Sequence, residues 1–178
     1  MIMKDILAKP AAAAAAAVAA AGLLTAAQSA PGGTRSGTES FTLTTHSLGA
    51  NPAYQAVAKG VFSAKGTMQA TSGASNAPLK ATFPGGTFMI DKEKPGKQSG
   101  TVNGSTCRAS YTATGATYKI SDGTGSYKGI AGGGTATVTF TGTLPKLSSG
   151  KCNESGNAVP VAGTTFTAVH ASGPVTLP

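Results

Sequence analysis

Residues 135–144 read Thr-Ala-Thr-Val-Thr-Phe-Thr-Gly-Thr-Leu, so that threonine alternates with an apolar or small residue at every step. A period of two places the threonines on one face of a β-strand and the intervening residues on the other. Threonine, valine and phenylalanine also favour strands over helices. The stretch therefore predicts a half-buried strand, with its threonines in water and Ala136, Val138, Phe140 and Leu144 against a core.

The same alternation appears toward the start of the domain. Phe41 and Leu43 alternate with threonines, and the even positions of residues 54–68 are mostly small or apolar. Glycine inside such a run commonly marks a bend. Residues 54–68 therefore predict either one long half-buried strand or two strands bent at Gly60.

Further strands are expected wherever apolar and polar residues alternate between turn residues. These are 79–83 and 87–90, which flank a Pro-Gly-Gly turn as a hairpin, and 166–170 with 175–177 as a last pair. Residues 91–100 differ, because alternating charges surround a Pro-Gly pair, and they predict an exposed loop.

One predicted strand changes the phase of its apolar face. The odd positions from Cys107 to Ala113 are apolar, whereas Tyr118 and Ile120 continue the pattern on even positions. An extra residue in a strand shifts the alternation by one. We therefore expect a β-bulge at Gly115.

No convincing window of helical period follows the first thirty residues, and threonine is abundant where glutamate is scarce. Regularly spaced short strands between turns indicate an all-β fold, either a closed barrel or a β-sandwich. Closure would also remove exposed sheet edges, which this sparsely charged sequence has few charged side chains to protect.

The first thirty residues have a different composition. Lys4 and Lys9 give a weakly positive start, an alanine-rich run covers 11–27, and small residues then precede Pro31. A positive start, a short apolar run and a small-residue cleavage site are features of a secretory signal peptide. Two cleavage positions fit, after Ala27 or after Ser29.

The alternative for this run is an uncleaved membrane anchor. Residues 11–27 are at the lower limit of the roughly 17–25 residues that span a bilayer, and alanine contributes little transfer free energy. We therefore expect a protein secreted to the exterior or to the cell envelope, with no membrane span after cleavage. The expected organisation is a signal peptide at 1–29, a flexible leader at 30–40 and a β-barrel domain at 41–178.

The chain is basic, with a formal net charge of +8. Cleavage of residues 1–29 would remove Lys4, Lys9 and Asp5 and leave +7. The positive side chains are spread along the sequence, which indicates attraction to an anionic envelope polymer or simply solubility. Nucleic acid is not an expected partner, because the chain is exported and lacks interleaved aromatic and basic residues.

Cys107 and Cys152 are the only cysteines. In an exported chain an even pair predicts a disulfide, worth about 4 kcal/mol on the chain-entropy model; two free thiols are the alternative. No metal site is expected, because the spacing of these cysteines and of His46 and His170 matches no ligand pattern.

The sequence assigns no catalytic residue. It lacks a Gly-x-Ser-x-Gly elbow, and its glycine-rich stretch precedes a strand and lacks Gly-Lys-Ser/Thr, so that no nucleotide or other cofactor is expected. His170 alternates in phase with Phe166 and Ala168, which predicts that it faces the core. Together with Tyr111 and Tyr118 it is a candidate for contacts with a ligand.

The most distinctive stretch begins Gly123-Thr-Gly-Ser-Tyr-Lys-Gly129 and continues through three glycines at 132–134. With the Thr-Phe-Pro-Gly-Gly segment at 82–86 and the two cysteines, it resembles small secreted bacterial proteins of the allene oxide cyclase-like barrel type, to which dirigent proteins are similar. The resemblance covers about residues 79–152. It implies a closed eight-stranded antiparallel barrel with a central cavity, and it transfers no catalytic residue.

The residues agree with such a barrel. Tyr127 and Ile130 can close one end, and small inward residues such as Ala56, Ala109 and Ala136 leave room inside. The expected function is binding of a small apolar or amphipathic ligand in the interior. The alternatives are an isomerase-like or cyclase-like barrel enzyme and an envelope protein that acts through its basic surface. No oligomeric state is predicted.

Overall fold

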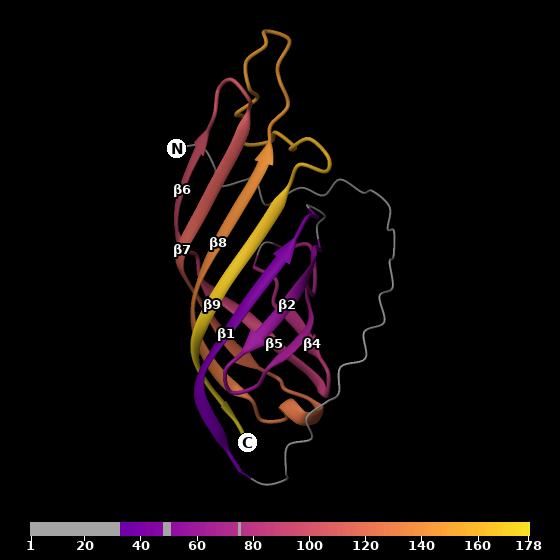
Figure 1. The fold of residues 1–178 in the computed structure, drawn as a ribbon, viewed down its shortest axis with the longest axis vertical. Helices are drawn as coiled ribbons and strands as arrows, with labels where there is room; N and C mark the ends of the chain where they lie inside the picture. Colours follow the sequence, from indigo (N-terminus) through magenta and orange to yellow (C-terminus); the bar gives the residue numbers. More distant parts are fainter. Residues whose placement is uncertain (1–32, 48–50, 75) are drawn as a thin grey trace.

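The computed structural model of the protein describes residues 33–47, 51–74 and 76–178, so that the predicted signal peptide lies outside the described residues. Those residues form antiparallel strands and one short 3-10 helix (Figure 1). The strands are β1 (Arg35–Thr45), β2 (Ala53–Lys59), β3 (Ala64–Ala70), β4 (Leu79–Phe83), β5 (Gly86–Lys94), β6 (Lys97–Val102), β7 (Arg108–Ser121), β8 (Ala131–Thr143) and β9 (Phe166–Leu177), and the helix is η1 (Gly125–Tyr127).

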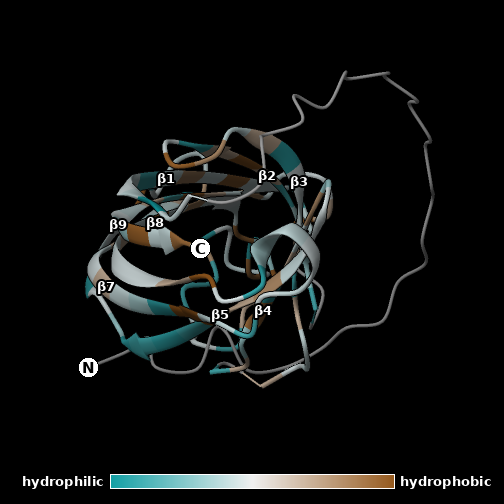
Figure 2. Ribbon diagram, turned by 90° about the horizontal axis from the view of Figure 1, so that it is seen from below, coloured by the Kyte–Doolittle hydropathy of each residue, from teal (hydrophilic) through white to brown (hydrophobic). Residues whose placement is uncertain are grey.

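Eight of these strands close into a barrel. Their order is β5-β4-β3-β2-β1-β9-β8-β7, and β5 pairs with β7 to complete the ring (Figure 2). Strand β6 lies outside the ring and pairs with the first half of β7, whereas β5 pairs with the second half. The predicted all-β fold and closed eight-stranded antiparallel barrel are confirmed, and the β-sandwich alternative is wrong.

An aromatic cluster fills the end of the barrel near η1. The rings of Phe41, Phe62, Phe83, Phe88 and Tyr127 come from separate segments, with neighbouring centroids 5.0–6.3 Å apart. Burial of a large apolar side chain contributes about 1.5–3 kcal/mol, so that this cluster stabilises the closed ring substantially. The Tyr127 hydroxyl also donates a hydrogen bond to the Pro84 carbonyl, at 3.2 Å.

The predicted closure of one barrel end is present. Tyr127 and Ile130 are 5% and 3% exposed and belong to the main core. Between them the chain must turn back sharply, and Gly129 has a φ of 80°, which favours glycine. The first part of the motif, residues 123–130, therefore covers the barrel end, and its last glycines begin strand β8 (Figure 2).

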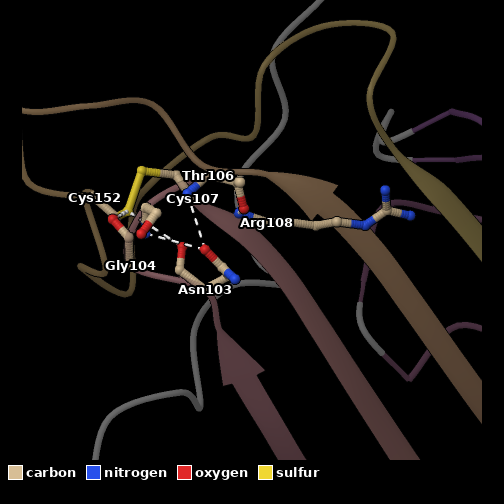
Figure 3. Close-up of a disulfide and its surroundings, with 7 residues drawn as sticks. Asn103, Gly104, Thr106, Cys107, Arg108 and Cys152 are labelled. Atoms are coloured by element: carbon tan, nitrogen blue, oxygen red, sulfur yellow. Dashed lines mark hydrogen bonds between the residues drawn. A yellow bond between two sulfur atoms is a disulfide. The ribbon is translucent and has the colours of Figure 1, made fainter.

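The predicted disulfide joins Cys107 to Cys152. It lies at the opposite end of the molecule, where the segment after β8 folds back over the β6–β7 turn (Figures 1 and 3). The side-chain oxygen of Asn103 accepts hydrogen bonds from the backbone N–H groups of Ser105 and Thr106, at 3.1 and 3.0 Å. A small second core, with Ala109, Leu144 and Ala158, surrounds the bridge.

Two predictions about individual strands are confirmed. The register between β7 and β8 shifts between Ala113 and Ala116, which places the expected bulge around Gly115. Residues 54–68 form two strands, β2 and β3, separated at Gly60. A Cβ atom at Gly60 would lie 2.1 Å from the Thr38 carbonyl oxygen, so that the bend requires glycine.

Three predicted boundaries are wrong. The exposed loop expected at 91–100 is mostly strand, because residues 91–94 of β5 and 97–100 of β6 both pair with β7. The predicted pair at 166–170 and 175–177 is one strand, β9, in which Pro174 lies where pairing with β8 is interrupted. Strand β1 begins at Arg35, so that most of the expected 30–40 leader belongs to the barrel.

Candidate ligand site inside the barrel

Glu39 is a buried acid inside the barrel. It alternates with Phe41 and Leu43 on the inward face of β1 and is 0% exposed. Glu39 was not among the predicted site residues, because residues 30–40 were predicted to be a flexible leader. The available signal was the alternation itself, since the inward phase of Phe41 and Leu43 continues backward to position 39.

The two carboxyl oxygens of Glu39 have different surroundings. Oε2 accepts a hydrogen bond from the Phe62 backbone N–H at 3.0 Å and so fixes the turn between β2 and β3. Oε1 is buried and has no hydrogen-bond partner among the described residues. Burial raises the pKa of the Glu39 carboxyl, and the backbone donors at this turn oppose that effect only in part.

Tyr118, one of the predicted ligand residues, also lies inside the barrel. It is 6% exposed, and its hydroxyl is buried without a hydrogen-bond partner among the described residues. Burial, and to a smaller extent the charge of Glu39, raise the pKa of Tyr118 to about 12. The phenol therefore remains protonated and keeps a hydrogen to donate throughout the physiological range.

Two glycines lie between Glu39 and Tyr118 along the barrel wall. Glu39 pairs with Gly173 on β9, and Tyr118 pairs with Gly134 on β8. The two glycines are in close contact, because a Cβ atom at Gly173 would lie 2.6 Å from the Gly134 Cα. The inner wall between the carboxyl and the phenol consequently carries no side chain.

Small apolar residues lie beside these glycines, on the side of the barrel away from η1. Ala116, Ala136 and Ala171 are consecutive cross-strand partners on β7, β8 and β9, and each is only partly buried. Val169 and Tyr54 are also partly buried and pack against the main core. The lining on this side is therefore apolar and incompletely covered.

His170 does not join this site. It is exposed and pairs with Thr42 and Thr137, both on the outer face of the barrel. The prediction that it faces the core is wrong because its neighbours Val169 and Ala171 take the inward positions. His170 instead lines a shallow outer hollow with hydroxyl side chains that include Ser40 and Ser172.

Tyr111 lies on the part of β7 that extends beyond the barrel ring. Its ring stacks on Phe140 with centroids 6.2 Å apart, and it packs against the small core around the disulfide. Of the three predicted ligand residues, the structure therefore places only Tyr118 beside Glu39.

The described residues, 33–47, 51–74 and 76–178, contain no group of three His, Cys, Asp or Glu side chains positioned to hold a metal ion. Over the same part of the chain, no helix has the length and apolar character needed to cross a membrane. Comparison of the chain with protein-family profiles, with curated proteins and with solved structures gave no match.

Proposed function

We propose that this protein is an exported barrel that binds a small apolar or amphipathic molecule in its interior, on the side away from η1. The observation that carries the proposal is the partly exposed apolar lining beside two buried, unpaired polar groups. An apolar ligand would cover the lining that Ala136, Val169 and Ala171 leave exposed, at about 25 cal/mol per Å² of surface removed from water.

The unpaired Tyr118 hydroxyl supports the same assignment. A buried polar group without a partner costs about 1–3 kcal/mol, a cost that a ligand group can remove. Replacement of Tyr118 by Phe should therefore leave the free protein as stable as before, or more stable. The same variant should weaken binding of any ligand that hydrogen-bonds to the phenol.

The disulfide supports the export part of the proposal. Cys107 and Cys152 are bridged, and such bridges persist mainly in oxidising compartments. Expression of the whole chain in an exporting host, followed by mass measurement of the product, tests for cleavage after Ala27 or Ser29. A product that keeps residues 1–29 would overturn this part.

Binding is tested by titration of the oxidised protein with N-phenyl-1-naphthylamine, a neutral apolar fluorescent probe. We expect saturable binding with a Kd of about 1–10 µM. Ala136→Leu should weaken binding at least about tenfold, because the added side chain occupies the lining. Thr137→Leu adds a comparable side chain to the outer face of the same strand and should leave binding unchanged. Absence of saturable binding, or equal losses in both variants, would contradict the proposal.

A second candidate function is attachment to an anionic envelope polymer. Among the described strands β1, β7, β8 and β9, the only acidic residue is Glu39, which faces inward. The outer face of this wall carries hydroxyl groups together with Arg108 and Lys119. Adsorption to alginate should then decrease strongly between 0.01 and 1 M salt, over which the Debye length falls from about 30 to about 3 Å.

The adsorption test has a matched control. Lys119→Glu changes the charge of this wall, whereas Lys80→Glu makes the same change on β4, another part of the barrel. Loss of adsorption in the Lys119 variant alone would support attachment through the wall. Equal losses would show that only net charge matters.

A further inference from the structure

We propose that the barrel interior selects ligands that end in a neutral hydroxyl group, and that this group binds between Glu39 and Tyr118. The inference rests on the proposed function, because it names the chemical class of ligand for the same site. Two buried polar atoms support it: Glu39 Oε1 and the Tyr118 hydroxyl, neither of which has a hydrogen-bond partner among the described residues.

The two groups require different hydrogen-bonding partners. When Glu39 is ionised, Oε1 is an acceptor beside Oε2, which already accepts from the Phe62 N–H, and the Tyr118 hydroxyl has a hydrogen to donate. An alcohol hydroxyl can donate to the first and accept from the second. One such group bound between them would therefore provide a partner for each buried atom.

The wall between the two groups carries no side chain. Gly173 pairs with Glu39 and Gly134 pairs with Tyr118, and the backbone alone forms the wall between the two groups. Each glycine is so close to the neighbouring strand that a Cβ atom would lie within 2.2 Å of a carbonyl oxygen. No residue with a side chain fits at either position without a shift of the backbone.

Other head groups satisfy the site less well. A carboxylate can accept from Tyr118 but brings a negative charge to the buried acid Glu39. An ammonium group can donate to Glu39 but cannot accept from Tyr118. An alkane leaves both groups unpaired. The apolar residues on the side away from η1, such as Ala116 and Ala136, would cover the tail of the ligand.

The test uses the oxidised full chain and displacement of N-phenyl-1-naphthylamine by 1-decanol, decanoate and decylammonium, which share one tail. We expect decanol to bind at least about tenfold more tightly than decanoate, which corresponds to about 1.4 kcal/mol. Tyr118→Phe should abolish this preference. Tyr111→Phe, which removes another buried and unpaired hydroxyl from the part of β7 beyond the barrel ring, should preserve it.

A second variant tests the carboxyl group. In Glu39→Gln the amide oxygen can keep the Phe62 hydrogen bond, so that an amide N–H replaces the unpaired carboxyl oxygen and the negative charge is removed. The preference should then shift toward decanoate by at least about tenfold. If this variant does not fold, Tyr118→Phe still decides the question.

The outcomes separate the two proposals. Saturable binding with equal affinity for decanol and decanoate would refute selection of a hydroxyl group and leave the proposed ligand binding intact. An unchanged preference for decanol over decanoate in Tyr118→Phe would also refute selection of a hydroxyl group and leave the proposed ligand binding intact. If neither the probe nor any of the three compounds binds saturably, the proposed function itself fails.

Discussion

The bridge between Cys107 and Cys152 should contribute a large part of the free energy of unfolding. The two residues are 45 positions apart. On the chain-entropy model, removal of a bridge that closes a loop of that length lowers the free energy of unfolding by about 4 kcal/mol. Replacement of both cysteines by alanine is therefore expected to cost about 4 kcal/mol, a large share of the 5–15 kcal/mol typical of a domain.

The assay is equilibrium unfolding in urea, followed by far-UV circular dichroism and by tyrosine fluorescence, which is free of tryptophan emission because the chain has no tryptophan. The double variant should show a lower midpoint. Asn103→Ala provides the control, because it removes two hydrogen bonds of the same turn without opening the covalent loop. That variant should cost about 1 kcal/mol.

A loss in the double variant no larger than that of Asn103→Ala would refute the chain-entropy argument for this loop. Such a result would mean that the unfolded chain already restrains residues 107–152. The bridge belongs to the small second core, and neither cysteine lines the candidate site. Probe binding by the folded double variant should therefore match that of the oxidised protein.

Further predictions concern the core, the glycine contact and two titrating groups. Phe88→Ala should cost about 3–5 kcal/mol in urea unfolding, because Phe88 is 0% exposed at the centre of the aromatic cluster. Gly134→Ala should lower the melting temperature, since its Cβ would lie 2.2 Å from a backbone oxygen of β9; Gly104→Ala, with no atom within 4 Å, should leave it unchanged. Burial raises the pKa of Glu39, so its stabilising contribution is complete below about pH 4.5 and is lost as the pH rises through the native pKa; Glu39→Gln should flatten that part of the stability profile. The pKa of Tyr118 is raised to about 12, so its contribution is present below pH 10 and lost as the pH rises toward 12; absorbance at 295 nm should show at least one tyrosine ionising later in the native than in the unfolded protein.

Much of the architecture could be predicted because its signals are local. Alternation at 135–144 identified the central strand β8, and the phase slip near Gly115 identified the bulge in β7. The disulfide followed from cysteine count and expected compartment. These features depend on residues close in sequence or on composition, which a single sequence displays directly.

The candidate site was only partly predictable. Tyr118 was selected, but Glu39 was missed, because a run rich in Gly, Ser and Thr reads as a leader and an acidic side chain is expected in water. His170 was assigned to the wrong face, because its alternation with Phe166 and Ala168 gives a period without showing which phase turns inward.

The sequence by itself determined that the chain forms strands, where most of them alternate and which cysteines pair. The tertiary structure alone decided that β5 meets β7 to close the ring, that β1 carries an acid into the interior and that His170 faces outward. The physical reason is that a period of two is a property of one strand, whereas the choice between its two faces is made by neighbours. For β1 and β9 those neighbours are each other, more than a hundred residues apart in the sequence and paired from Arg35–Leu177 to Thr45–Thr167.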